Sequence, residues 1–292
     1  MKGIALAALV SAAFSAPAMA QTADPAQTDP APAAEASPHT VTGNLGVFSS
    51  YRFRGIDQTF GKPALQGGID YAHASGFYLG NWNSNVSSGA GFPDGNLEMD
   101  FYGGYKGTFG DFGLDVGAIY YYYPGSEASV LGTGANSGAV NNKELYIGGS
   151  WKFVSLKYFY SLDDYFSLRG VNSASVATGR NTHGSQYLDL SANYDLGAGW
   201  GINAHVGSLN LQNVHNGNYT DWKVGVTKDL SGWVLAASYI GTDAAGDCST
   251  PSSYQPYCFT NSNSDKNGVL EVGSHTKDAG RGIAVVSVSR AF

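Results

Sequence analysis

The chain has 292 residues, with 40 glycines, 13% aromatic residues, 13% charged residues and a formal net charge of −7. Soluble domains usually carry about 25% charged residues, so the composition disfavours an ordinary soluble domain. The acidic balance also excludes an electrostatic basis for binding nucleic acid, because phosphate groups attract basic proteins.

A transmembrane β-barrel fits this composition better. Half of its strand residues face lipid and half face water, so the average hydropathy stays near zero. The mean hydropathy of this chain is −0.16. An exported soluble β-sandwich is the alternative, although it should carry more charge. After Ala20, no apolar run approaches the ~18 residues that a membrane-spanning helix requires.

The first 20 residues have the features of a signal peptide. Lys2 supplies the positive end, an apolar segment follows, and Ala18-Met19-Ala20 is a typical cleavage site. Residues 21–39 are rich in Ala and Pro and show no periodicity, so we expect a disordered periplasmic tail. We therefore expect an exported protein that resides in the outer membrane of a Gram-negative bacterium.

Twelve segments after this tail have strand character, most of them alternating apolar and polar residues. Short connections between them alternate with longer loops, notably 124–142, 162–184 and 242–280. This pattern is typical of outer-membrane barrels, whose short turns lie in the periplasm. We predict an all-β fold over residues 40–292, a transmembrane antiparallel up-and-down barrel of about twelve strands. The predicted strands are 40–54, 64–73, 76–86, 96–107, 112–123, 143–151, 154–161, 185–196, 200–208, 219–229, 233–241 and 281–292.

The first predicted strand places charged residues on one face. Leu45, Val47 and Phe53 share the apolar face, whereas Arg52 and Arg54 fall on the polar face. Arginine is costly in a packed apolar core, but it suits a water-filled lumen.

The same region carries a resemblance to a known family. Its motifs are Ser50-Tyr-Arg-Phe-Arg-Gly55, Gln58-Thr59, Pro63-Ala-Leu-Gln-Gly-Gly68, Asp70-Tyr71 and Ser75-Gly-Phe-Tyr78. These motifs resemble the TorF-type porin family of proteobacteria, outer-membrane proteins that are mostly uncharacterised. The resemblance implies an outer-membrane barrel and implies no particular substrate.

The polar face of the predicted strands supplies the candidate pore-lining residues. Such groups either line a conduit and set its selectivity or neutralise one another in an occluded lumen. The candidates are Arg52, Arg54, Asp70, Glu98, Asp100, Lys106, Asp115, Glu144, Lys157, Asp189, Asn203, His205, Asp221 and Lys223.

Several other residue patterns in the chain have simpler interpretations than a catalytic or metal-binding site. Cys248 and Cys258 lie in the last long loop of an exported chain, so we expect a disulfide that staples this loop. His205 invites comparison with barrel hydrolases, but no serine is its near neighbour on its own strand face, which leaves only a pair across strands. The glycines at 132–138 lack the strand-to-helix context of a phosphate loop. Solvated carboxylates explain Asp243 and Asp247 better than calcium ligands do. We therefore expect no catalytic residue, no metal and no cofactor.

The terminal residue suggests how the barrel is inserted. Phe292 matches the terminal aromatic residue that barrel-assembly machinery usually recognises, so we expect that machinery as a partner. Membrane lipid and lipopolysaccharide are the other expected partners. Trp151, Trp200 and Trp233 lie beside predicted short turns, as expected for an aromatic girdle.

The expected function is passive diffusion of small polar solutes or ions. Twelve strands lie between the ~8 that side chains nearly fill and the ~16–18 that leave a wide channel, so the pore should be narrow. Inward acids outnumber inward bases, which predicts a mild cation preference opposed by Arg52 and Arg54. A closed structural or surface-interaction barrel and a lipid hydrolase are the alternative functions.

Overall fold

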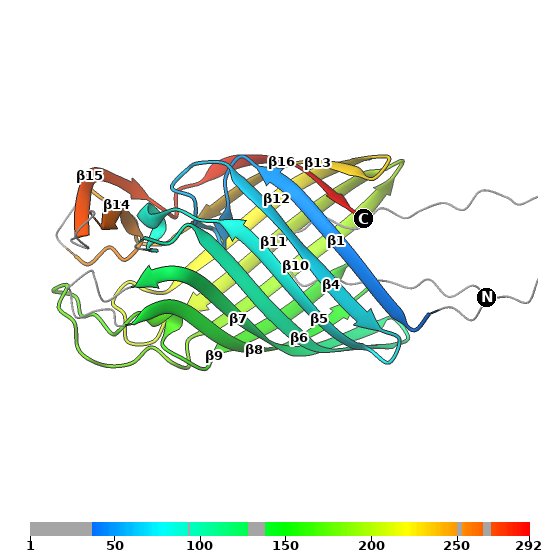
Figure 1. The fold of residues 1–292 in the computed structure, drawn as a ribbon, viewed down its shortest axis with the longest axis horizontal. Coiled ribbons are helices and arrows are strands. Elements are labelled where there is room, and N and C mark those ends of the chain that lie inside the picture. Colours follow the sequence, from blue (N-terminus) through cyan, green and yellow to red (C-terminus); the bar gives the residue numbers. More distant parts are fainter. Residues whose placement is uncertain (1–36, 93, 128–137, 250–252, 265–269) are drawn as a thin grey trace, which may run out of the picture.

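The chain forms a closed β-barrel, shown in Figure 1 as a computed structural model. The structure describes residues 37–92, 94–127, 138–249, 253–264 and 270–292. The predicted signal peptide and nearly all of the predicted tail lie outside these residues. In the part of the chain that is described, no helix is long and apolar enough to cross a membrane.

Twelve antiparallel strands pair around the barrel in the order β1-β16-β13-β12-β11-β10-β9-β8-β7-β6-β5-β4. The ring closes where β1 pairs with β16, so the topology is the predicted up-and-down one. The wall strands are β1 (His39–Phe48), β4 (Ala64–His73), β5 (Phe77–Asn85), β6 (Leu97–Phe109), β7 (Phe112–Glu127), β8 (Ala139–Trp151), β9 (Val154–Ser161), β10 (Gln186–Gly197), β11 (Trp200–Asn210), β12 (Tyr219–Leu230), β13 (Trp233–Thr242) and β16 (Ile283–Ala291). Each of the twelve predicted segments corresponds to one of these strands.

The outside of the barrel is apolar and the inside is polar. On β8, Leu145 and Ile147 are 48% and 54% exposed, whereas Glu144 and Tyr146 are 1% and 4% exposed. A protein surrounded by water would place these side chains the other way round. Apolar side chains on the outer face suit lipid hydrocarbon, so the alternation is that of a membrane-spanning barrel. The outward apolar set continues around the wall with Leu156, Leu188, Leu190, Val206, Val224, Val226 and Val286.

The two ends of the barrel differ in their connections. At the turn end, tight turns place Lys152, Ala198 and Ser231 in the left-handed backbone region. The C-terminus and the start of β1 also lie at this end (Figure 1). The opposite end, called the loop end, carries the long connections and the hairpin of β14 (Cys258–Ser264) and β15 (Leu270–Asp278).

Three tryptophans mark the turn end on the outside of the wall. Trp151, Trp200 and Trp233 are each about half exposed. Each ring has a cation over it, at 4.5 Å for Lys152, 5.0 Å for Lys228 and 5.3 Å for Arg290. Amphipathic rings beside basic groups are typical of the level of lipid headgroups. This arrangement matches the girdle expected from the sequence.

The first predicted strand is too long. It was expected to reach residue 54, but β1 ends at Phe48. Ser49 still exchanges hydrogen bonds with Val286 of β16, and the chain then leaves the wall for the lumen. Tyr51 shares the parity of Leu45 but is only 5% exposed, because inside the lumen both sides of the segment are covered.

Two predicted loops also contain more strand than expected. β7 runs to Glu127 and β8 begins at Ala139, so strand structure enters the predicted loop 124–142 from both sides. The predicted loop 242–280 contains the β14–β15 hairpin. Length and composition indicated a loop there because Asn, Ser and Thr predominate in the sequence of β14.

Cys248, in the connection that follows β13, forms a disulfide with Cys258, the first residue of β14. Replacing both by Ser should remove about 3 kcal/mol of local stabilisation in the chain-entropy description, without affecting the wall strands. We expect the Cys248→Ser/Cys258→Ser variant to keep the gel mobility of an unheated folded barrel and to gain protease cleavage between β13 and β16. Loss of the folded band at the wild-type unfolding temperature would contradict a purely local staple.

Candidate functional site

The residues that leave the wall after β1 form a plug, defined here as residues 49–63. Within it, β2 (Arg52–Phe53) pairs with β3 (Ile56–Asp57) in a short hairpin. Residues 50–59 are buried except for the half-buried Phe53. A segment with so little exposed surface cannot be an external loop, so the plug belongs to the interior of the barrel.

The tip of the plug is a two-residue turn. Arg54 and Gly55 have φ values of 47° and 79°, so both adopt the left-handed region that such hairpin turns require. Glycine is needed at the second position, because a Cβ on Gly55 would lie 2.7 Å from the Cβ of Asp221 and clash with the methyl group of Thr242. The tip therefore reaches β12 and the end of β13.

The plug crosses the lumen from one wall to the other. Near its start, the Tyr51 hydroxyl donates to Glu98 Oε1 on β6 at 3.2 Å. Further along, the ring of Phe53 packs edge-on against Tyr121 of β7, with centroids 5.4 Å apart. Together with the contacts of Gly55, these interactions connect opposite sides of the barrel through the plug.

Arg54 lies in what we call the Arg54 cage. Its guanidinium donates to both carboxylate oxygens of Glu144, at 3.0 and 2.6 Å, and to the hydroxyl of Tyr165 at 3.1 Å. Its Cζ lies 4.2 Å from the ring centroid of Tyr187 and 5.0 Å from that of Phe159. Planar bidentate pairing and ring stacking both suit a guanidinium.

Electrostatics keep the Arg54 cage in one charge state. Burial disfavours the charge on Arg54, but the Glu144 carboxylate outweighs it and holds the pKa of Arg54 well above its usual value. Burial also raises the pKa of Tyr165 to about 12, so its hydroxyl stays neutral. Tyr121 and Asn142 donate to the Glu144 carboxylate at 3.2 Å each and fix its orientation.

Arg52 anchors the base of the plug to the chain that precedes β16. Its Nη1 donates to the carbonyl of Ala279 at 2.7 Å, and its Nη2 lies 3.8 Å from Asp57 Oδ2. Burial lowers the pKa of Arg52, and Asp57 opposes this shift. Lys277 also pairs with Asp57 at 3.3 Å. The plug is therefore held at its base as well as at its tip.

His205 is enclosed by two carboxylates. Its Nε2 lies 2.7 Å from Asp221 Oδ2, and its Nδ1 lies 3.3 Å from both Asp189 Oδ1 and Ser191 Oγ. Ser191 is directly opposite His205 on the neighbouring strand, a pairing that inspection of one strand face does not reveal. Since Ser191 donates to Asp189 at 2.6 Å and each ring nitrogen faces an acid, the arrangement favours a charged imidazolium over a catalytic base.

A second set of paired charges lies nearer the turn end. Lys157 Nζ contacts Asp115 Oδ2 at 2.6 Å, and Tyr78 donates to the other oxygen of Asp115 at 2.6 Å. Lys106 lies over the Tyr78 ring, 4.5 Å from its centroid. Asp70 accepts from the hydroxyl of Tyr102 at 2.6 Å. These groups come from β4 to β9 and meet inside the barrel.

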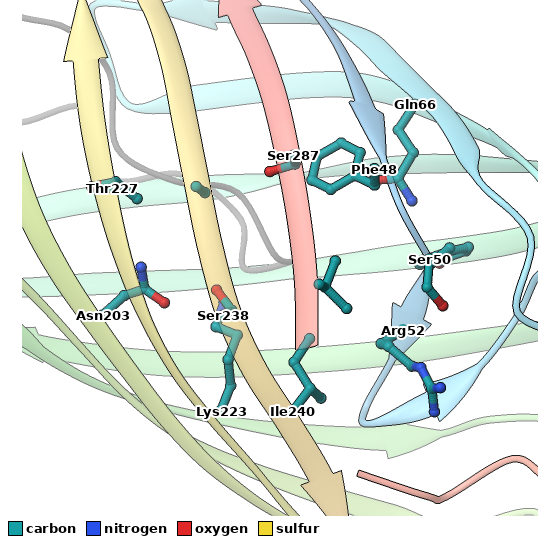
Figure 2. Close-up of a pocket in the computed structure, with 13 residues that line it drawn as sticks. Phe48, Ser50, Arg52, Gln66, Asn203, Lys223, Thr227, Ser238, Ile240 and Ser287 are labelled. Atoms are coloured by element: carbon teal, nitrogen blue, oxygen red, sulfur yellow. The ribbon is translucent and has the colours of Figure 1, made fainter. Parts of the chain in front are cut away.

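A cavity of about 60 Å³ lies beside the plug, between β1 and the strands from β11 to β16. Figure 2 shows Phe48, Ser50 and Arg52 on one side of this cavity and Lys223 and Ser238 on the other. Among the described residues that line it, two are cations and none is a carboxylate. The Oδ1 atom of Asn203, another lining residue, is buried without a hydrogen-bond partner. This space has room for a few water molecules.

The sequence-derived candidates therefore divide into two groups. Strand parity predicted that Arg52 and Arg54 belong to the wall of the lumen. This prediction is wrong, because both residues belong to the plug. The other candidates lie on wall strands, and their side chains contact other lumen residues or line the cavity. Glu98 and Asp100 are buried on β6 and have no ion-pair partner among the described residues. No group of three or more metal-ligating side chains occurs in the described part of the chain.

Sequence reasoning missed the aromatic and hydroxyl partners of the plug. Tyr165 lies in the short helix η3 (Tyr165–Ser167) within a predicted loop, and nothing in its neighbourhood marks it as a lumen residue. The one available signal was the Arg54-Gly55 pair, because glycine after a polar residue is typical of hairpin turns.

Substitution of Gly55 tests whether the plug tip is packed against β12 and β13. Gly55→Ala should lose about 1–2 kcal/mol from its left-handed backbone and about 1–3 kcal/mol more from the clash with Asp221 and Thr242. Gly197→Ala is the matched control, because Gly197 has a φ of 82° and open space around it. Chemical unfolding in detergent should show the larger loss for Gly55→Ala. Equal losses would contradict a packed tip.

Comparison with solved structures finds porins and a transporter. The NanC porin shares 9% sequence identity, with a TM-score of 0.48 over 87% of this chain and 99% of that one. The KdgM porin shares 10%, with a TM-score of 0.46 over 86% and 99%. The toluene transporter TodX of P. putida shares 13%, with a TM-score of 0.41 over 87% and 90%. At such values no solute or mechanism transfers to this chain, and its fold rests on its own strand pairing.

Comparison with known sequences identifies the family. No curated protein matches the chain at a significant level. A family model described as a bacterial protein of unknown function, Gcw_chp, matches residues 32–265, which is most of the chain. The TorF name suggested by the motifs near the N-terminus is not confirmed. The chain belongs to the Gcw_chp family of bacterial proteins of unknown function.

Proposed function

We propose that this protein is an outer-membrane channel of the porin type, through which small polar solutes or ions diffuse passively. The observation that carries the proposal is the polarity of the interior. A membrane-spanning barrel keeps charged residues on its inner face where water reaches them, and here at least four wall strands contribute such residues.

The plug would set the narrowest point of this channel. It spans the lumen between β6 and β12, and its two arginines are paired with Glu144 of the wall and with Asp57 of the plug itself. A solute would therefore pass only beside the plug or after the plug moves. A small cavity lies on the side of the plug that faces Lys223, next to Arg52.

The same plug supports a second candidate function. A barrel whose interior is filled by its own chain is also what a closed structural or surface-interaction protein requires. A catalytic role as a lipid hydrolase is disfavoured, because His205 faces a carboxylate at each ring nitrogen and is poorly placed to accept the proton of Ser191.

The proposal includes the location and the partners. The apolar belt would contact membrane lipid and, towards the loop end, lipopolysaccharide, while the tryptophans at the turn end would lie among the periplasmic lipid headgroups. Phe292 is 76% exposed and its backbone pairs with Gly43 of β1, so its ring would be accessible to barrel-assembly machinery.

Single-channel recording in planar bilayers distinguishes a channel from a closed barrel. We expect small unitary currents from the wild type, and larger ones when residues 50–59 are replaced by a flexible Gly/Ser segment, because the lumen is then cleared. The same replacement at the exposed loop residues 172–180 is the matched control and should leave the current unchanged. Silence from both the wild type and the plug variant would establish the closed barrel.

Reversal potentials under a salt gradient test the ion preference. Asp70 and Glu98 form no salt bridge among the described residues, so they should favour cations in the lumen. Asp70→Asn with Glu98→Gln should move the reversal potential towards zero. Asp163→Asn, which removes a charge paired with Lys143 at the loop end, should have little effect. A wild type that prefers anions would contradict the proposed lumen electrostatics.

A further inference from the structure

The Arg54 cage is built almost entirely by the barrel wall. Glu144 is on β8, Phe159 on β9 and Tyr187 on β10, while Tyr165 comes from the connection between β9 and β10. Only the ring of Phe53, 4.8 Å from the Arg54 Cζ, comes from the plug itself. The wall therefore presents a complete set of cation-binding groups, and the plug supplies the cation.

The groups in this cage are specific for a guanidinium. The two oxygens of Glu144 accept two parallel N–H bonds from Arg54, which a planar fork can donate and an ammonium cannot. The ring of Tyr187 lies at stacking distance from the same plane. Tyr121 and Asn142 hold the carboxylate in place, so the acceptor is oriented independently of Arg54. The cage offers one negative charge, which matches a monovalent cation.

The backbone supports the same interpretation. Two-residue turns of this type favour Asn, Asp or Gly at the first position, because a side chain is strained at positive φ. Here the position holds Arg54, with a φ of 47°. Turn geometry does not explain an arginine at the tip, whereas its side-chain contacts do. The strain also makes the intramolecular occupant a weaker competitor than an unstrained ligand would be.

We propose that the Arg54 cage is a binding site for soluble guanidinium compounds, and that Arg54 is its built-in occupant. A solute with a guanidinium group would compete with Arg54 for Glu144 and for the ring faces of Phe159 and Tyr187, and its binding would release the plug tip. The inference rests on the proposed function for the route by which the solute arrives. Guanidinium cations would then be the class of solute that the channel admits. Tethering gives Arg54 a high effective concentration, so release requires millimolar solute.

Chemical rescue tests the site without relying on transport. Arg54→Ala removes the side chain beyond Cβ, and ethylguanidinium reproduces the missing atoms. In detergent, millimolar ethylguanidinium should raise the unfolding temperature of Arg54→Ala by several degrees and reach saturation. Urea has the same planar shape without charge, and ethylammonium has the charge without the fork, so neither should match this effect. A rise that is equal for all three compounds, or absent, overturns the proposal.

Two further variants isolate the cage. Arg54→Ala combined with Glu144→Gln should lose the rescue, because the bidentate acceptor is gone. Arg52→Ala removes the other plug arginine, whose partners are backbone carbonyls and Asp57, and ethylguanidinium should not restore it. Rescue that is undiminished in either variant would place the binding elsewhere. If Arg54→Ala refolds poorly, its yield of folded barrel with and without ethylguanidinium gives the same comparison.

Hydrogen exchange of the wild type tests the competition itself. Agmatine, a soluble guanidinium compound, should accelerate exchange of the buried amides at residues 50–59, whereas urea at the same concentration should not. Unchanged exchange overturns the release of the plug. If ethylguanidinium rescues Arg54→Ala but the barrel conducts no current, the proposed channel is contradicted and the proposed binding site is supported. If the barrel conducts current but ethylguanidinium does not rescue Arg54→Ala, the proposed binding site is contradicted and the proposed channel is supported.

Discussion

Lipid on the outside of the barrel governs the rest of the structure, because hydrocarbon cannot satisfy a backbone amide or a charge. The wall meets this requirement by closing β1 against β16, so that no strand edge faces the membrane. The charged residues are then confined to the interior together with the chain that follows β1. Their dense pairing follows from this confinement, since buried charges are tolerated only with partners.

The interior pairs are distributed in a way that gives the plug two unequal attachments. At its base, Arg52 is bonded to backbone carbonyls near β16 and is close to Asp57 of the same plug. At its tip, Arg54 is bonded to a wall carboxylate that other wall residues already hold in position. Breaking the first attachment disturbs the plug and its neighbouring chain. Breaking the second exposes a preformed receptor, so a conformational change of the plug is expected to begin at its tip.

Much of the wall could be predicted from sequence because the residues of a strand in a membrane barrel alternate between two faces. The face towards lipid is apolar and the face towards the lumen is polar. Asp189 and Leu190, adjacent in sequence, fall on opposite faces by this rule alone. The rule fails after Phe48, since a segment inside the lumen is covered on both sides and its alternation carries no information. The relation between Ser191 and His205 was also out of reach, because cross-strand neighbours depend on register. Tyr165 was missed because its position depends on the path of a long connection.

The place of the plug in the chain has a consequence for the order of assembly. Arg52 and its partner Ala279 are 227 residues apart, and the ring is completed by the pairing of β1 with β16. The plug is therefore enclosed by parts of the chain that lie far apart in sequence, and a closed ring would leave it little room to thread in afterwards. The sheet must therefore close around a segment that already lies on its inner face. The plug would thus act as an internal template for the barrel. Contacts between residues so far apart in sequence make the final closure of the ring a slow step in folding.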